Sequence, residues 1–584
     1  MHKSKYNTLF LILLLILSLS LVVLTAEAQI PLKIEVKGVA GKLKENVLAY
    51  LTIYQERDSP YLSEYRLQRL HEQSPKEIRS ALQPFGYYKP TIHSDLVQKN
   101  GGWYAYYQIN LGPQVKVKDI TITIKGNGAD DPQFQEFIKK FPIKKGSTLS
   151  HAQYEETKKR LYSIANERGY FDAKLIEHEI RINLKENSAS IILSFDTGER
   201  YRFGEVTFKQ DILDPDYLKK FIPFKRGAPY IISKLSELQN SLNNSEYFSS
   251  VEIQPYPDKA KDFKVPIVVD LEPLERQRFS LGIGYGTDTG ARASLGWKVR
   301  RLNQLGHKLD TEANISEISQ DITTHYIIPI ADPATDYLAF NAGWSREDYA
   351  SRRSDKYLLG TSYNHSFDKW LETFYLNYEQ EKFRIGEDNG RSTLVLPGAK
   401  WSWVSTKNIT YTYHGSRLDF RIKGTDMAIG SDTSFLQSRL QLKFIQGLEG
   451  IGRVILRGEI GSSLIDKFSE LPLSQRFFTG GDQSVRGYAY KSLGPKDAQG
   501  TVLGGKYLLV GSIEYEQNIY GDWSAAIFYD TGNTMNNFST ALENGAGFGI
   551  RWKSPVGLIR LDLANALSVP DHPWRLHLVL GSIL

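Results

Sequence analysis

Charged and apolar side chains alternate along short segments throughout residues 275–584, and this pattern constrains the fold more than any other feature. The alternation has the two-residue period of a β-strand. A soluble sandwich would have to bury the charged faces in its core at a high free-energy cost. A barrel with lipid outside and water inside avoids that cost, and it pairs every backbone group. We therefore expect a transmembrane barrel of about sixteen antiparallel strands, with the pattern clearest in residues 439–444, 453–460, 557–563 and 574–580.

Three repeats of about 80 residues precede this region. Each begins with a strand-like run, continues with helical patterning and ends with two strands. Small α+β domains with helices on one face of a short sheet fit this order, and we expect them at 29–112, 113–198 and 199–274. The helical part of each repeat ends in a matching corner, Gly86-Tyr87-Tyr88, Gly169-Tyr170-Phe171 and Glu246-Tyr247-Phe248.

The third repeat shows its helix most clearly. Ile232, Leu235, Leu238 and Leu242 recur at helical intervals, which predicts a helix that buries all four side chains. The uncovered edge of each sheet is available for pairing with an extended client segment. A purely structural role as a spacer is the alternative.

The N-terminus predicts export from the cytoplasm. Basic residues precede the apolar run 9–24, and the small-x-small pattern Ala26-Glu27-Ala28 follows it. These features predict a secretory signal peptide over residues 1–28, with cleavage before Gln29. An uncleaved anchor is the alternative, because the apolar run approaches membrane-spanning length.

A glycine-rich stretch, 474–495, interrupts the barrel region and has Val485-Arg486-Gly487-Tyr488 at its centre. By strand count it is the sixth extracellular loop, between the eleventh and twelfth strands. Strand parity turns Glu514, Asp530 and Gly532 of the next two strands toward the lumen. Two carboxylates on adjacent strands make a receptor for a planar guanidinium group.

Three motifs carry a family resemblance. They are Val485-Arg486-Gly487-Tyr488, Gly511-Ser512-Ile513-Glu514-Tyr515 and Phe528-Tyr529-Asp530-Thr531-Gly532. With the repeats, which resemble POTRA domains, they resemble the BamA–TamA superfamily of outer-membrane assembly factors. The resemblance implies that the loop folds into the lumen, where Arg486 latches onto Glu514 and Asp530. The alternative is that Arg486 is an exposed loop charge.

Three repeats and this chain length resemble the TamA branch of the superfamily. The resemblance implies a factor that inserts or exports β-barrel and autotransporter proteins in the outer membrane of a Gram-negative bacterium, with its repeats in the periplasm. It implies a TamB-like, periplasm-spanning partner from the inner membrane, unfolded clients and outer-membrane lipids as partners, and no nucleic acid. A two-partner secretion transporter and a passive channel are the alternatives.

The seam between the first and last strands is the expected entry point for a client strand. Glycines in the first strand provide few side chains to hold that edge, and a client strand pairs there by β-augmentation. Relief of crowding in a tilted barrel is the other explanation of these glycines. The predicted gate residues are Phe279, Gly282, Gly284 and Gly286 on the first strand and Trp574, Leu576, Leu578 and Leu580 on the last.

No catalytic, cofactor or metal site is visible in the sequence. The chain has no cysteine, which excludes disulfides and thiolate metal sites. Gly500 to Tyr507 nearly matches a phosphate-binding loop, but Tyr507 stands where a Ser or Thr should bind magnesium, and no helix follows. We therefore expect a protein that is not an enzyme and needs no cofactor.

Overall fold

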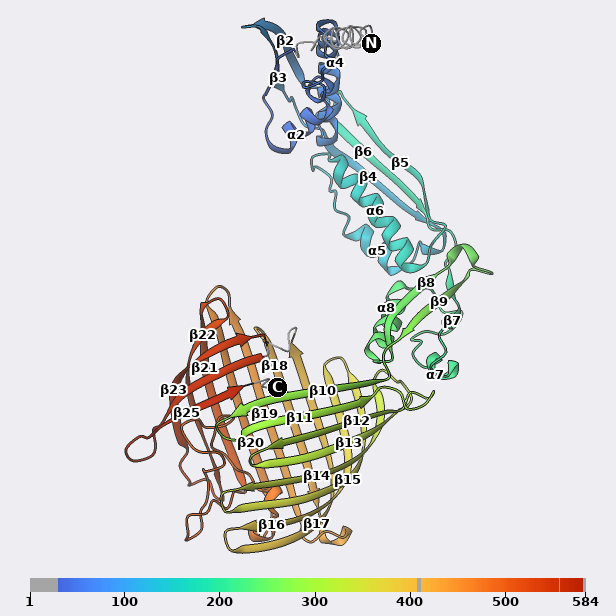
Figure 1. The fold of residues 1–584 in the computed structure, drawn as a ribbon. Coiled ribbons are helices and arrows are strands. Elements are labelled where there is room, and N and C mark those ends of the chain that lie inside the picture. The colour runs from blue at the N-terminus through green and yellow to red at the C-terminus, as the bar shows by residue number, and fades with distance from the viewer. Residues whose placement is uncertain (1–29, 407–410, 556, 581–584) are drawn as a thin grey trace, which may run out of the picture. The chain divides into compact units, whose positions relative to one another are not determined.

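A computed structural model describes residues 30–406, 411–555 and 557–580 (Figure 1). The predicted signal peptide lies outside these residues. In the part of the chain that is described, three small sheet-helix units precede a closed barrel, as the sequence predicts. No helix within the same residues is long and apolar enough to cross a membrane.

The first unit pairs its first strand with its last. Its three-stranded sheet has the order β1-β3-β2, in which β3 lies parallel to β1 and antiparallel to β2. Helix α4 begins after Ser63, whose hydroxyl accepts a hydrogen bond from the Arg66 N–H as an N-cap. Its buried face packs with the sheet in one apolar core. The elements are β1 (Leu32–Lys37), α2 (Gly41–Tyr50), α3 (Thr52–Gln55), α4 (Glu64–Leu82), η1 (Gln83–Phe85), β2 (Thr91–Lys99) and β3 (Gly102–Asn110).

The second and third units repeat this order, with sheets β4-β6-β5 and β7-β9-β8. In the second unit, Phe134 of α5 and Leu161 of α6 share an apolar core with Phe195 of β6. The elements are β4 (Lys116–Lys125), η2 (Gly126–Gly128), α5 (Pro132–Lys139), α6 (His151–Arg168), β5 (Lys174–Asn183), β6 (Ser188–Asp196), β7 (Arg202–Lys209), α7 (Pro215–Lys219), α8 (Ile232–Asn244), β8 (Phe248–Pro255), η3 (Pro257–Lys259) and β9 (Lys264–Pro273).

The predicted buried stripe of α8 is wrong at one position. Leu235, Leu238 and Leu242 are buried, whereas Ile232 is 46% exposed. Ile232 is the first residue of α8, and it lies beyond the packed part of that helix face.

The three corners share a left-handed backbone. Gly86, Gly169 and Glu246 have φ angles of +85°, +82° and +61°. Glycine adopts this conformation without steric cost, whereas another residue pays about 1–3 kcal/mol. The third corner therefore carries strain at Glu246, which the carboxylate partly offsets through an ion pair with Lys298 at 3.3 Å.

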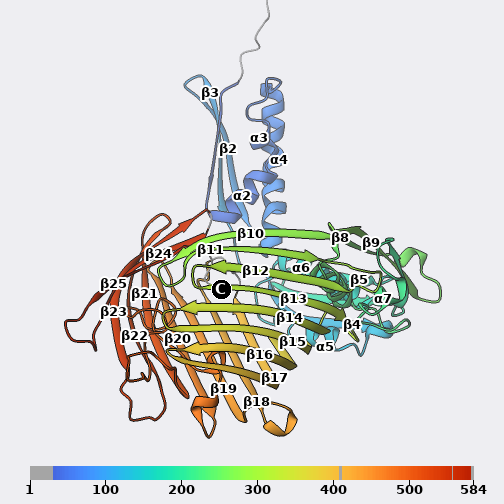
Figure 2. The ribbon, with the colours of Figure 1, turned by 60° about the horizontal axis from the view of Figure 1, so that its bottom comes forward.

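The barrel contains sixteen antiparallel strands among the described residues, and Figures 1 and 2 show them as one closed wall. Side chains alternate between the faces, with Leu456 and Ile513 exposed outward and Arg453 and Glu514 buried on the inner side. The strands are β10 (Gln277–Gly286), β11 (Gly290–Val299), β12 (Lys308–Ser316), β13 (Ser319–Pro329), β14 (Asp336–Tyr349), β15 (Arg352–Phe367), β16 (Trp370–Ile385), β17 (Asp388–Thr406), β18 (Gly415–Thr425), β19 (Phe435–Leu448), β20 (Gly452–Leu464), β21 (Tyr507–Tyr520), β22 (Trp523–Met535), β23 (Glu543–Ser554), β24 (Gly557–Ala566) and β25 (Trp574–Leu580).

The connection between β20 and β21, residues 465–506, folds into the barrel and is called loop 6 here. It includes η5 (Phe468–Glu470) and η6 (Leu473–Gln475); a further short helix, η4 (Met427–Ile429), follows β18. Loop side chains Val485 and Tyr488 are buried in an apolar cluster with Val510 of the wall. The loop also contacts the wall away from this cluster, because Gln475 donates to Glu379 of β16 at 2.9 Å and Arg352 of β15 donates to the Lys491 carbonyl at 3.0 Å. Loop 6 therefore occupies the lumen and is held from several sides.

The third unit contacts the β11–β12 turn of the barrel. The Tyr247 hydroxyl, at the strained corner, donates to the carbonyl oxygen of Gly306 at 2.6 Å and lies 3.1 Å from the hydroxyl of Tyr217. Lys308 Nζ donates to the Ser245 carbonyl at 2.7 Å. The corner of the third unit is thus a joint as well as a turn.

Candidate functional site: the loop arginine and its receptor

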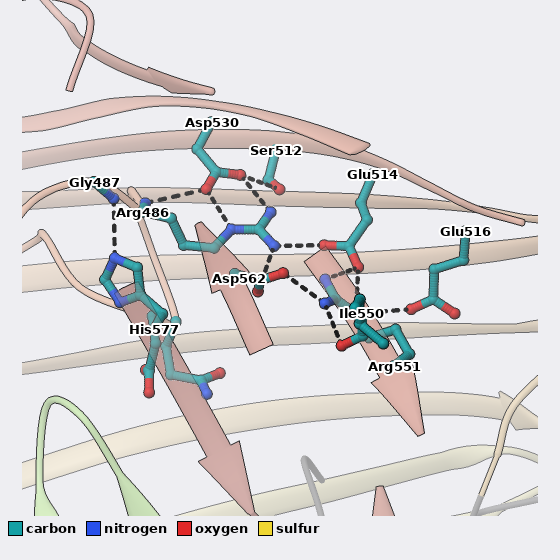
Figure 3. A network of polar contacts seen from close by, with 12 residues as sticks. Arg486, Gly487, Ser512, Glu514, Glu516, Asp530, Ile550, Arg551, Asp562 and His577 are labelled. Atoms are coloured by element: carbon teal, nitrogen blue, oxygen red, sulfur yellow. Dashed lines mark hydrogen bonds and ion pairs between the residues drawn. The ribbon is translucent and has the colours of Figure 1, made fainter. Parts of the chain in front are cut away.

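Arg486 lies at the centre of loop 6 and is fully buried against the wall (Figure 3). Its Nε and Nη2 donate to the two carboxylate oxygens of Asp530 at 2.7 and 2.9 Å, a bidentate pair. The backbone N–H of Arg486 donates to Asp530 Oδ2 at 3.1 Å. Its Nη1 donates to Glu514 Oε2 at 2.6 Å. The structure thus places the loop arginine against both carboxylates that strand parity turns inward.

A second arginine adds a further positive charge to the carboxylates around Arg486. Arg551 of β23 is fully buried and donates through Nη2 to Glu514 at 2.7 Å and through Nη1 to Asp562 of β24. Asp562 also accepts from Arg486 Nη1 at 3.3 Å. We call Arg486, Glu514, Asp530, Arg551 and Asp562 the latch network. Charges buried this deeply are stable only when each is paired and hydrogen-bonded, so the five side chains depend on one another.

Neutral groups complete the contacts of the latch network. The Phe528 ring centroid lies 3.4 Å from the guanidinium carbon of Arg486, in a cation–π contact. The Ser512 hydroxyl donates to Asp530 Oδ1 at 2.6 Å. The Phe528 contact holds the guanidinium plane of Arg486, and the Ser512 hydrogen bond holds the carboxylate of Asp530.

Two glycines let the loop backbone approach the wall. Gly487 has a φ angle of +95°, and a Cβ there would lie 3.0 Å from the Asn565 carbonyl group. Its N–H donates to His577 Nε2 of the last strand at 3.0 Å. Gly545 of β23 faces the loop, and a Cβ on it would lie 2.0 Å from the Arg486 carbonyl oxygen. The close approach therefore needs glycine on both surfaces.

The remaining predicted loop and receptor residues surround this contact. Val485 is buried in the loop cluster, and the Tyr488 hydroxyl donates to the Asn544 carbonyl at 3.0 Å. Gly532 is buried two residues beyond Asp530, where a Cβ would lie 2.7 Å from the Leu509 carbonyl oxygen. Gly532 thus leaves room between strands rather than binding Arg486. The roles of these residues as latch and receptor stay predictions.

Sequence reasoning missed Arg551, Asp562 and His577 as neighbours of Arg486. The alternation in β24 and β25 already turns Asp562 and His577 inward, so the signal was present. Alternation alone does not predict which inward side chains contact each other, because these contacts depend on the stagger between neighbouring strands.

The predicted gate residues lie on two strands whose described parts are paired with each other at one end. Within the described residues, β25 pairs with β10 at Tyr285–Leu580 and Gly286–Val579 only. Positions 574–577 of β25 have no partner on β10, because β10 ends at Gly286. Phe279 lies on the outer face of the first strand and is 68% exposed, whereas Gly282 lies on the inner face, where a Cβ would meet the Ser294 hydroxyl of β11. Trp574, Leu576, Leu578 and Leu580 alternate with inward-facing Arg575 and His577.

The latch network can hold a loop against a wall, and it contains no nucleophile paired with a base. No group of three or more potential metal-ligating side chains occurs among residues 30–406, 411–555 and 557–580. That the protein is not an enzyme stays a prediction.

Family models match nearly all of the described chain. The model described as Omp85 superfamily domain matches residues 272–582, more than half of the 584 residues. The model described as POTRA domain TamA domain 1 matches residues 33–111. The model described as Surface antigen variable number repeat, a POTRA model, matches residues 115–198 and 201–273.

Curated relatives include outer membrane protein assembly factor BamA of Neorickettsia risticii (strain Illinois). It is 21% identical over 472 residues, which cover 74% of this chain and 62% of the relative. BamA of Nitratidesulfovibrio vulgaris is 23% identical over 349 residues, 56% of this chain and 44% of that protein. The chain thus spans less than two thirds of the length of these relatives.

A solved structure shares the fold. The crystal structure of BamA from Haemophilus ducreyi lacking POTRA domains 1–3 superposes with a TM-score of 0.67 at 18% identity. The match covers 80% of this chain and 99% of that chain.

Proposed function

Because the chain belongs to the Omp85 superfamily, we propose that it is an outer-membrane assembly factor of the TamA type. It is a barrel of the Gram-negative outer membrane, and its POTRA domains lie in the periplasm. In the proposed function it inserts or exports β-barrel and autotransporter proteins without nucleotide hydrolysis. The client strand enters through the seam between β10 and β25.

The exposed outer face of β10 at the seam carries this proposal. Among the described residues, β10 pairs with β25 at Tyr285–Leu580 and Gly286–Val579. The outward side chains Phe279, Leu281 and Ile283 of β10 are 68%, 79% and 85% exposed. A client strand pairing with β10 would cover them while satisfying its own backbone.

The filled lumen supports a lateral route over a passive channel. Loop 6 contacts β15, β16 and β22 through charged or polar side chains, and its apolar cluster packs on β21. A solute passing through the barrel would have to displace all of these contacts. A lateral opening at the seam leaves them in place.

The proposed partners follow from the same assignment. The match of residues 33–111 to a TamA-type POTRA domain supports a TamB-like partner that spans the periplasm from the inner membrane. Unfolded outer-membrane or autotransporter proteins are the proposed clients, and outer-membrane lipids surround the barrel.

Quantitative proteomics of outer membranes from a deletion strain tests the function. Complementation with the wild-type chain provides the control for expression. The assembly function predicts reduced levels of several β-barrel or autotransporter proteins. Loss of one secreted protein alone would identify a two-partner transporter, and altered solute uptake with unchanged barrel proteins would identify a channel.

A further inference from the structure

The lumen holds a cavity that the latch network does not fill. It has a volume of about 600 Å³, within the range of small-molecule sites. Tyr411 and Pro555, in turns at the periplasmic end of the barrel, line one part of it, and Gln483 of loop 6 lines another. The charged side chains that line it are Arg417, Asp419, Lys443, Arg453, Arg457, Glu459, Glu514, Glu516 and Arg560.

Every carboxylate in this lining already has an arginine partner. Each carboxylate of the lining is therefore shared with an arginine, and the remaining cations of the lining have no lining carboxylate to themselves. The pairs are Asp419 with Arg417, Glu459 with Arg439, Glu514 with Arg486 and Arg551, and Glu516 with Arg453.

Three cations remain without full compensation. Arg560 of β24 is buried, and its Nε and Nη2 are enclosed with no hydrogen-bond partner among the residues that the structure describes. Lys443 of β19 has no ion pair or hydrogen bond among the described residues. Arg457 of β20 stands directly opposite Lys443, and its nearest carboxylate oxygen, on Asp530, is 3.6 Å away. Like charges at opposed positions and a buried guanidinium with unsatisfied donors both destabilise this part of the barrel wall.

We propose that this cavity binds a soluble anion carrying a phosphate group, held by Arg560, Arg457 and Lys443. A phosphate oxygen pair fits the planar donors of an arginine, and its remaining oxygens accept from the other two cations. Three cations facing one ligand match a group of two or more negative charges. The cavity has room for the rest of a small phosphorylated molecule.

The lining favours a soluble ligand over a lipid headgroup. All of the charged lining residues project from the inner face of the barrel, and loop 6 lies over the cavity. A lipid phosphate would have to leave the bilayer and enter the lumen, whereas a soluble phosphate compound enters from the periplasmic end.

Arg457 connects the cavity to the latch network. Its Nη1 donates to the Gln483 carbonyl of loop 6 at 3.0 Å, and its Nη2 donates to the Ser512 hydroxyl at 3.0 Å. Ser512 in turn donates to Asp530. A bound anion therefore fixes the side chain that joins loop 6 to the wall, and it stabilises the docked loop.

Calorimetric titration of the full chain in detergent with inorganic pyrophosphate tests the site, in a chloride-free buffer of low ionic strength. The variants are Arg560→Gln and the double variant Arg560→Gln/Lys443→Gln. Arg421→Gln is the matched control, because Arg421 has the inward parity of Arg417 on β18 but lies outside the cavity. Heat-modifiable migration on gels checks that each barrel is folded.

The proposal predicts binding by the wild type and by Arg421→Gln, at least tenfold weaker binding by Arg560→Gln, and none by the double variant. A rise in the melting temperature with pyrophosphate should follow the same order. Absence of wild-type binding, or equal weakening in Arg560→Gln and Arg421→Gln, would overturn the site. If micelles that contain phosphatidic acid abolish pyrophosphate binding, the lipid headgroup competes for the site. That result would contradict the proposal that the ligand is a soluble phosphate compound.

Discussion

The carboxylate of Asp530 accepts three hydrogen bonds from Arg486, two from the guanidinium and one from the backbone N–H. The backbone bond ties the main chain of loop 6, and not only a flexible side chain, to the β22 wall. Loss of either residue would leave its partner buried without its main counter-charge, which costs about 3–5 kcal/mol.

Arg486→Ala and Asp530→Ala should each lower the free energy of unfolding by about 3–5 kcal/mol. Arg486→Lys should rescue little, because lysine keeps the charge but loses the planar fork. Urea unfolding in detergent measures stability, and the levels of assembled client proteins in cells measure function. Lys496→Ala is the control, an exposed cation of the same loop. Wild-type stability and activity in both alanine variants would refute the latch.

Gly545→Ala should undock loop 6 without touching any charge. Its Cβ would lie 2.0 Å from the Arg486 carbonyl oxygen, whereas a Cβ on Gly458 of β20 would meet nothing within 4 Å. Overpacking of this kind costs about 1–3 kcal/mol. Limited proteolysis should therefore cut loop 6 faster in Gly545→Ala than in Gly458→Ala. Equal cleavage rates would show that the close backbone approach is unimportant.

Tyr247→Phe should loosen the joint between the third unit and the β11–β12 turn. The substitution leaves the Gly306 carbonyl without its buried donor, at a cost of about 1–3 kcal/mol. Hydrogen exchange of the amides in residues 303–308 should accelerate. Tyr61→Phe, at a tyrosine that is 82% exposed, provides the control. Unchanged exchange in Tyr247→Phe would mean that the joint depends on other contacts.

Asp288, in the turn between β10 and β11, should make loop docking sensitive to pH. Its carboxylate accepts the Asp482 N–H of loop 6 at 2.6 Å. Burial first, and the Asp482 charge second, raise the pKa of Asp288 to about 6. A raised carboxyl pKa favours the protonated folded state, so the stabilisation is present at pH 4 and is lost as the pH rises through about 6.

The melting temperature of Asp288→Asn, relative to wild type, measures this effect. Asparagine mimics the protonated acid, so the variant should be more stable than the wild type at pH 8, and this advantage should shrink as the pH falls below about 6 and be lost near pH 4. Asp571→Asn, at an exposed turn residue between β24 and β25, controls for general charge effects. A difference from wild type that does not change with pH would contradict the assignment.

The sequence predicts the barrel, the repeats and the Arg486 contact for identifiable reasons. Strand parity turns Glu514 and Asp530 inward, and the family resemblance brings the loop to them. Arg551 and Asp562 escape prediction because contacts across several strands depend on stagger, which alternation does not encode. Glu246 is a second feature that the sequence does not predict. The repeat aligns it with Gly86 and Gly169, but its left-handed backbone is seen only in the structure.

The central claim is that a client enters through the seam, and a disulfide across that seam tests it most directly. The natural chain has no cysteine, so Tyr285→Cys/Leu580→Cys places one pair across β10 and β25. Leu281→Cys/Leu295→Cys places the control pair across β10 and β11. The account predicts that oxidation stops client assembly only in the seam pair and that reduction restores it. Full client assembly with the seam locked would contradict the account.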